Sequence, residues 1–161
     1  MPNKRILVIY YSRTGFTKKV AQEIAKRFDC EIEEIQEKAN RKGIIGFILG
    51  GRDALQKRRT NIHPTSKNIS DYDLVIMGTP VWAYHITPAL RTFIADNKGK
   101  FKNVALFSTQ GGTSNSKVLE DHLELFNKKP AAVLKVTGKD FKSEDYIKSV
   151  EIFSAEILKL G

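Results

Sequence analysis

Three short stretches of the sequence carry residues that could do chemistry, and the first suggests an anion site. It spans residues 11–17 (Tyr-Ser-Arg-Thr-Gly-Phe-Thr) and leads directly into a helical pattern. It offers three aliphatic hydroxyl groups, a glycine that permits close backbone approach, and the unpartnered N–H groups of a helix start. Hydroxyl and amide groups at a helix N-terminus bind phosphate. We therefore predict a phosphate site at this stretch.

Two common nucleotide motifs are missing, and this narrows the kind of phosphate. The sequence contains neither the Gly-x-x-x-x-Gly-Lys-Ser/Thr motif of the Walker loop nor the Gly-x-Gly-x-x-Gly motif of dinucleotide folds. A phosphate held by hydroxyls and amides, without an obligatory cation, suits a mononucleotide cofactor better than a nucleotide turned over with magnesium. The alternative interpretation is that the hydroxyl groups only cap the helix.

The second and third stretches suit a flat ring. Residues 78–85 (Gly-Thr-Pro-Val-Trp-Ala-Tyr-His) contain the only tryptophan, and a planar ring could stack on its indole or on Tyr84. Residues 108–115 (Ser-Thr-Gln-Gly-Gly-Thr-Ser-Asn) are small and polar, so their backbone could hydrogen-bond the rim of a heterocycle. The alternatives are a local core cover and an ordinary flexible turn. No partner carboxylate is evident for His85, so we expect its placement to be chance.

Each of these stretches follows an apolar run of strand length. The runs Ile6–Tyr10, Leu74–Met77 and Val104–Phe107 lack polar alternation, as is typical of parallel strands covered on both faces. Ala131–Val136 is a fourth run, and the more polar residues 30–35 suggest an edge strand. The carboxyl ends of parallel strands meet at one edge of a sheet, so the three stretches should lie together.

Helical patterns lie between the strands and predict an α/β fold. Apolar stripes occur within residues 20–28 and 90–94, and a last helix is expected over residues 144–159 with Ser143 as its cap. A further stripe predicts a buried helix face made by Val118, Leu119, His122, Leu123 and Phe126.

The three stretches together carry a family resemblance. Val8–Thr17, followed by Ala21, resembles the phosphate-loop signature of the flavodoxin family, in which Ser/Thr-x-Thr-Gly-x-Thr surrounds the phosphate of FMN. Gly78–Trp82 resembles the second flavin loop of that family, and Thr109–Ser114 falls where its third loop is expected. The resemblance covers essentially the whole chain. It implies one domain over residues 1–161, a three-layer sandwich whose five-stranded parallel sheet has the order 2-1-3-4-5.

The resemblance also implies noncovalent FMN at the point where the strand order reverses. Carried over residue by residue, it assigns the phosphate to Ser12, Thr14, Gly15 and Thr17, with Arg13 and Phe16 as the variable residues between them. It assigns the two sides of the ring to Thr79, Pro80, Val81, Trp82, Ala83 and Tyr84, and to Thr109, Gln110, Gly111 and Gly112.

Two departures from electron-shuttling flavodoxins bear on function. The third loop has no aromatic residue, which suggests a more open flavin face suited to hydride transfer or to a flat substrate such as a quinone. The chain is also basic, whereas such flavodoxins are typically acidic.

We expect an FMN protein of intracellular electron transfer, or alternatively an NAD(P)H-dependent quinone or FMN reductase. Whether it is an enzyme or an electron carrier stays open, and a module that binds nucleic acid or an acidic protein is a more distant alternative.

Composition and charge set further limits. The 161 residues carry a net charge of +9, and eight basic residues and one acidic residue between Lys38 and Lys67 account for seven of these charges. We expect this basic insertion to border the flavin entrance and to recruit an anionic partner. Within it, residues 43–51 suggest a helix packed on the sheet, or else a flavin wall or homodimer interface.

One cysteine and three scattered histidines indicate neither a disulfide nor a metal site. No apolar run is long enough to span a membrane, so we expect a cytoplasmic protein.

Overall fold

The computed structural model of the chain describes residues 4–112 and 115–160. Thr113 and Ser114, which belong to the third stretch, lie outside the described residues. Five parallel strands form one sheet in the order β2-β1-β3-β4-β5, so the predicted topology is confirmed. The strands are β1 (Ile6–Tyr10), β2 (Glu31–Glu34), β3 (Leu74–Pro80), β4 (Val104–Gln110) and β5 (Val133–Thr137).

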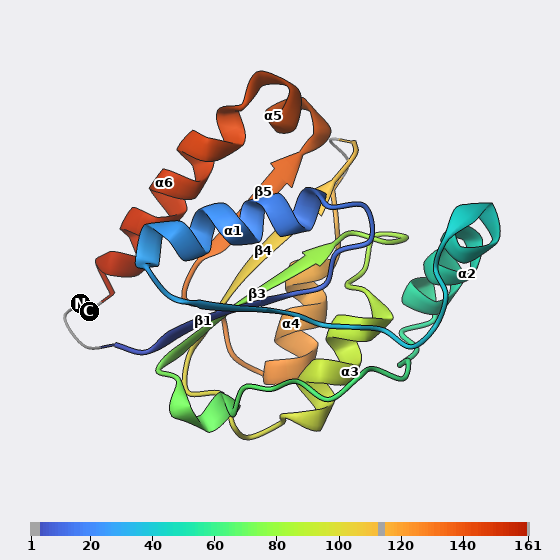
Figure 1. Cartoon of the computed structure of the whole chain (residues 1–161), viewed down its shortest axis with the longest axis horizontal. Coiled ribbons are helices and arrows are strands. Elements are labelled where there is room, and N and C mark those ends of the chain that lie inside the picture. Colours follow the sequence, from blue (N-terminus) through green and yellow to red (C-terminus); the bar gives the residue numbers. More distant parts are fainter. Residues whose placement is uncertain (1–3, 113–114, 161) are drawn as a thin grey trace.

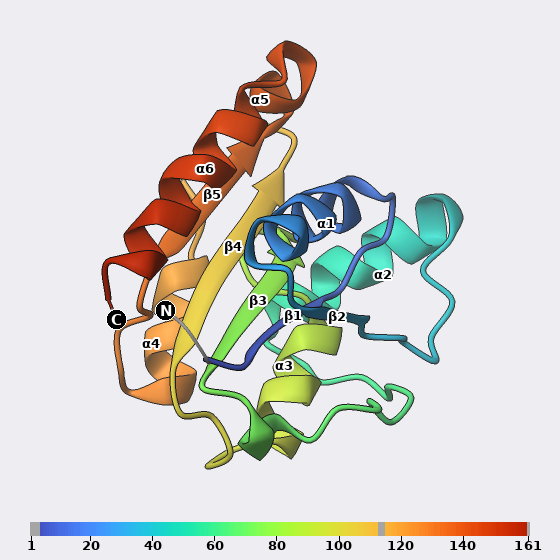
Figure 2. The same ribbon diagram turned by 60° about the vertical axis from the view of Figure 1, so that its left-hand side comes forward.

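Helices cover both faces of this sheet (Figures 1 and 2). The apolar side chains of the sheet divide between two buried clusters, one under α1 and α6 and the other under α3 and α4. Val8 and Ile76 face the first cluster, and their strand neighbours Leu7 and Met77 face the second. The helices are α1 (Phe16–Phe28), α2 (Gly43–Leu55), α3 (Pro88–Asp96), α4 (Val118–Phe126), α5 (Gly138–Ser143) and α6 (Asp145–Leu158), with a short 3₁₀ turn at Ile69–Asp71.

The burial of the strands explains why the sequence pattern located them. The central strands β1, β3 and β4 are buried on both faces almost throughout, which requires continuous apolar runs. The edge strand β2 is exposed or half-buried, as its charged residues predicted. At the opposite edge, β5 alternates between buried and exposed residues because only one of its faces meets the core.

Two helix predictions need correction. On α4 the buried residues are Val118, Asp121 and His122, whereas Leu119 and Leu123 are exposed. The apolar stripe was misleading because the carboxylate of Asp121 has partners inside the protein, so α4 buries Asp121 and exposes the two leucines. The last helix predicted over residues 144–159 is α6, but Ser143 is not its cap. Ser143 ends the separate short helix α5, which Thr137 and Asp140 start with a reciprocal cap after β5.

The basic insertion is a loop that leaves the sheet after the edge strand β2 and returns to pair with its own start. Its two ends pair through an isolated antiparallel bridge between Glu37 and Ile62. Helix α2, inside it, lies at the periphery in both views rather than on the sheet (Figures 1 and 2), so the interpretation as a sheet-packed helix is wrong. No helix in the described part of the chain is long and apolar enough to cross a membrane.

Gly78 makes room for the ring of its cross-strand neighbour Phe107 and yields a stability prediction. A Cβ at this position would lie 2.0 Å from Cζ of the buried Phe107 ring. We expect Gly78→Ala to lower the free energy of unfolding by about 1–3 kcal/mol, the usual cost of overpacking a dense core. Urea unfolding measures it, and Gly112→Ala, where a Cβ would have open space, is the matched control. Equal midpoints for the two variants would contradict the prediction.

Candidate functional site

The first stretch forms a tight turn that opens onto the N-terminus of α1. Gly15 precedes the helix with φ +96°, a left-handed conformation that favours glycine. The hydroxyl of Ser12 accepts a hydrogen bond from the Gly15 N–H at 3.1 Å, so it shapes the turn. The same hydroxyl lies 3.4 Å from the Lys18 N–H in the first turn of α1, so it also contributes to capping the helix. The N-cap residue Gly15 has no side chain, and no acidic residue lies in the first turn, so the positive end of the helix dipole and its other N–H groups suit an anion.

Two hydroxyl groups join the first stretch to the third. Oγ1 of Thr17 lies 2.8 Å from Oγ1 of Thr109, and both residues are buried. This contact crosses from the start of α1 to the end of β4. It holds two of the three stretches at a set separation.

A cavity of about 610 Å³ lies where the three stretches meet. This is within the range of about 300–1,000 Å³ typical of small-molecule sites. The sequence-predicted residues that line it are Arg13, Thr14, Phe16, Thr17, Pro80, Val81, Trp82, Thr109, Gln110 and Gly111. The other predicted site residues, which do not line it, are Ser12, Gly15, Thr79, Ala83, Tyr84 and Gly112.

The structure gives some of these other residues supporting positions. Thr79 is fully buried, and its hydroxyl lies 3.2 Å from that of Thr87, the cap of α3. Tyr84 is exposed and lies outside the cavity lining, so Trp82 is the aromatic residue of the second stretch that faces the cavity.

Other elements bring further aromatic residues to the cavity. Phe47 comes from α2, within the residues 43–51 for which a flavin wall was one alternative, whereas sequence reasoning missed Phe141 and Tyr146, which come from the segment after β5. The rings of Phe16, Phe141 and Tyr146 form a row with successive centroid separations of 4.9 Å. Because β5 ends at the same edge as β3 and β4, the strand-end rule applied to β5 would have located Phe141.

Trp82 is held from two sides. Its ring meets Tyr11 edge to face at 5.6 Å, and a Cβ on Gly50 of α2 would lie only 2.7 Å from its Cζ3 atom. The backbones of Trp82 and His85 pair across a tight turn in which Ala83 and Tyr84 have positive φ values of 45° and 73°. The indole therefore lies between α2 and the cavity in a set orientation.

A buried ion cluster supports the same turn. Asp121 of α4 is only 1% exposed, and its carboxylate lies 3.0 Å from Nδ1 of His85 and 3.2 Å from Nη2 of Arg91. It also accepts a hydrogen bond from the Ile86 N–H at 3.0 Å. The expectation that His85 has no carboxylate partner is therefore wrong. The partner lies 36 residues away on another helix, so local spacing did not reveal it.

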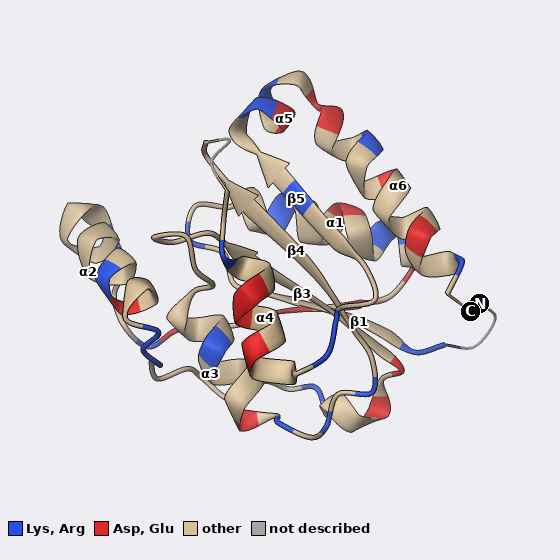
Figure 3. Cartoon of the chain, turned by 180° about the vertical axis from the view of Figure 1, so that it is seen from behind, with Lys and Arg blue, Asp and Glu red and all other residues tan. Residues whose placement is uncertain are grey.

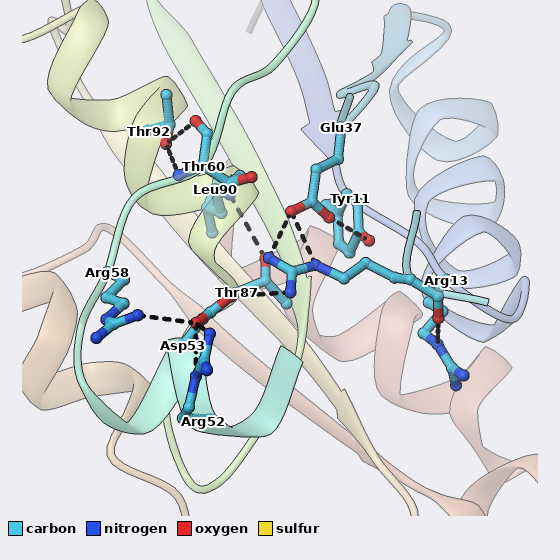
Figure 4. A network of polar contacts seen from close by, with 11 residues as sticks. Tyr11, Arg13, Glu37, Arg52, Asp53, Arg58, Thr60, Thr87, Leu90 and Thr92 are labelled. Atoms are coloured by element: carbon cyan, nitrogen blue, oxygen red, sulfur yellow. Dashed lines mark hydrogen bonds and ion pairs between the residues drawn. The ribbon is translucent and has the colours of Figure 1, made fainter. Parts of the chain in front are cut away.

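Arg41 is the centre of a second, partly buried network. Figure 4 shows the labelled residues around it, among them Glu37, Asp53 and Tyr11. Its guanidinium donates to Glu37 at 2.8 Å and to Asp53 at 2.9 Å, and the other oxygen of Glu37 accepts from the Tyr11 hydroxyl at 2.9 Å. Arg13 donates to the backbone oxygen of Arg41 at 2.8 Å. The network therefore joins the first stretch to both ends of α2.

These contacts shift two pKa values. Burial and the neighbouring Glu37 carboxylate raise the pKa of Tyr11, so its hydroxyl stays protonated and donates. Burial would raise the pKa of Asp53, but hydrogen bonds from Arg52 and Arg41 outweigh it and lower the pKa. Asp53 therefore remains a carboxylate at neutral pH.

The basic insertion is more strongly paired than its sequence suggested. Arg41, Arg52 and Arg58 all contact Asp53. Lys67 pairs with Glu31, and Lys57 pairs with Glu124. Figure 3 shows acidic residues close to basic ones over much of the molecule. Much of the positive charge of the insertion is therefore offset, and part of what remains lies at α2, on the exposed Lys42 and on the arginines that share Asp53.

The Asp121 cluster predicts a large effect of a nearly isosteric change. Asp121→Asn would leave Arg91 buried without its counter-charge, and we expect a loss of about 3–5 kcal/mol in the free energy of unfolding. Glu120→Gln is the matched control, because Glu120 is exposed and should change stability by less than about 0.5 kcal/mol. Chemical denaturation of both variants measures the difference, and similar losses would rule out this role for the cluster.

The contact between α2 and Trp82 yields a prediction about the site itself. Gly50→Ala should displace the indole, shift the emission of this single tryptophan and weaken FMN binding roughly fivefold, about 1 kcal/mol. Gly51→Ala, one residue along the same helix, has open space around the added methyl group and should leave both unchanged. Fluorescence spectra and FMN titrations test the pair, and identical behaviour would contradict the proposed packing.

Comparisons with known proteins agree with this geometry. The chain matches the family of NADPH-dependent FMN reductases over residues 4–145. A flavoprotein from Lactobacillus acidophilus NCFM, solved in complex with FMN, is similar with a TM-score of 0.70 and 24% identity, covering 89% of this chain and 99% of that one. A putative flavoprotein from Bacteroides eggerthii has a TM-score of 0.74 and 21% identity, covering 94% and 99%.

Oxidised flavodoxin 1 from Bacillus cereus has a TM-score of 0.57 and 22% identity, covering 96% of this chain and 97% of that one. No curated protein matches the chain. The family match spans most of the sequence, and the solved structures share its fold. The chain therefore belongs to the NADPH-dependent FMN reductase family and has a flavodoxin-like fold with FMN as its cofactor.

Proposed function

We propose that the protein is an oxidoreductase that uses FMN to move electrons from a reduced nicotinamide to a flat acceptor such as a quinone. The observation that carries the proposal is the lining of the cavity. Its aromatic residues are Trp82, Phe47, Phe16, Phe141 and Tyr146, of which the last three form a row, while Gln110 and Gly111 of the third stretch line it without a ring. A flavin bound among these residues would have no aromatic side chain of the third stretch over its ring, which would leave that face available to a second planar molecule.

The residues present fit FMN by their chemistry. The N-terminus of α1, which has no acidic residue in its first turn, and the hydroxyl-rich first stretch suit its phosphate, and the indole of Trp82 suits one face of its ring. Bound FMN supplies a redox centre that accepts a hydride and passes on electrons. The full set of predicted contacts, from Ser12 to Gly112, remains a prediction that binding measurements on single variants would test.

The charged residues at the cavity favour anionic co-substrates. Arg13, Lys19 and Lys142 line it together with a single carboxylate, Glu144. Their excess positive charge would attract the phosphate groups of NADH or NADPH and speed the encounter. Arg13 also binds the carbonyl oxygens of Arg41 and Gly43, so it orients the loop as well as contributing charge.

We also propose that the protein acts in the cytoplasm, where nicotinamide donors are available. Its only cysteine, Cys30, cannot form a disulfide within the chain, and burial raises the pKa of its thiol to about 11. This composition is usual for proteins of reducing compartments.

Anaerobic reduction of the purified holoprotein tests the proposal. We expect NADPH or NADH alone to bleach the visible flavin absorbance, and added quinone to restore it. A salt series should slow the reduction, because the attraction between the cavity cations and the donor is screened. If neither nicotinamide bleaches the flavin while an electron-transferring partner protein does, the protein is a one-electron carrier and the proposal is wrong.

A further inference from the structure

Helix α2 presents its large apolar side chains to the outside. The residues it buries are the small ones, Gly46, Gly50 and Ala54, which recur every four positions. A helix of a globular protein normally turns its large apolar residues toward the core. Here they are mostly exposed: Ile44 by 79%, Ile45 by 74%, Phe47 by 66%, Ile48 by 61% and Leu55 by 59%.

Close contacts hold the helix in this orientation. A Cβ on Gly46 would lie 2.2 Å from the backbone of Arg41, and one on Gly50 would meet Trp82. Arg41 binds Asp53 on the same side of the helix. Rotating α2 to bury its isoleucines would break the Arg41 network and drive larger side chains into these contacts. The exposed apolar face is therefore a specified feature of the fold.

Positive charge surrounds this face. Lys42 precedes the helix and is exposed, and Arg52 and Arg58 lie at its other end with side chains about half exposed. Asp53, the only acidic residue between positions 38 and 67, is already shared by Arg41, Arg52 and Arg58. An apolar helix face bordered by excess cations complements a surface that is apolar beneath an anionic layer.

A second copy of the chain fits this face less well. Two copies packed through α2 would bring the same cations together, which is unfavourable. The outward face belongs to a single helix of 13 residues. A bilayer accepts a single amphipathic helix without a matching protein surface.

We propose that α2 docks the protein on anionic lipid bilayers as an interfacial helix. Ile44, Ile45 and Ile48 enter the boundary between headgroups and acyl chains, and Lys42 and Arg52 contact lipid phosphates. Because Phe47 of the same helix lines the cavity with Trp82, docking places the cavity beside the membrane, where lipophilic quinones dissolve. The statement about quinones rests on the proposed function, whereas docking itself does not.

Vesicle flotation of the holoprotein tests the docking. We expect the protein to float with vesicles of phosphatidylcholine and phosphatidylglycerol, to bind pure phosphatidylcholine much more weakly, and to be partly released by salt. The variant Ile44→Ser/Ile48→Ser should lose at least about tenfold in affinity while keeping its FMN content and unfolding midpoint, because neither residue is buried or lines the cavity.

The matched control is Ile152→Ser/Leu158→Ser on α6, which removes two similarly exposed apolar residues, 62% and 50%, from another face. It should bind like the unmodified protein. Equal losses in both variants, or equal binding to the two kinds of vesicle, would overturn the proposal. A dimer in light scattering that Ile44→Ser/Ile48→Ser converts to monomer, with vesicle binding unchanged, would assign the face to a second copy instead. None of these measurements involves a nicotinamide, so a failure of the docking proposal can be distinguished from a failure of the proposed function.

Discussion

The buried guanidinium of Arg41 is the interaction on which the arrangement around the cavity depends. A charge with so little exposure is costly unless it is paired, and here Glu37 and Asp53 both bind it. Glu37 directly precedes the insertion, whereas Asp53 lies near the end of α2 within it, and Glu37 also accepts from Tyr11 after the end of β1. Since a buried ion pair adds little net stability, its main effect here is to fix which way α2 faces.

The orientation of α2 in turn sets the position of Trp82 at the cavity. Gly50 of α2 packs on Trp82, and Tyr11, itself bound to Glu37, touches the indole edge. The opposite end of the second stretch is fixed by Asp121, which binds both His85 and the Ile86 amide. The second stretch, which lines the cavity, is thus held by two carboxylate clusters, which limits the reorganisation needed when a ring binds there.

The structure also shows how much of the net positive charge is paired. The basic insertion suggested an open cationic surface, but Lys57 and Lys67 pair with carboxylates from distant elements, and three arginines share Asp53. The positive charge left over surrounds an exposed apolar helix. A patch of this mixed kind recognises a different partner from a purely cationic one, because its apolar core must also be removed from water.

The sequence by itself determined the sheet, its strand order through the family resemblance, and the location of the three loops. Continuous apolar runs mark strands buried on both faces, and glycine and hydroxyl residues mark a turn at a helix start, so these features are local and readable. The contacts that join distant elements were not readable. Asp121 with His85, Arg41 with Asp53, and Phe141 in the cavity depend on which segments meet in space.

Only the tertiary structure decided which way α2 faces. Its sequence is apolar on nearly every side, so periodicity could not distinguish a helix packed on the sheet from one that exposes its isoleucines. The choice was made by the close fit of Gly46 and Gly50 against Arg41 and Trp82, together with the ion pairs of Arg41. Packing of this kind depends on the shapes of segments far apart in the chain, which is why it emerges only in the folded molecule.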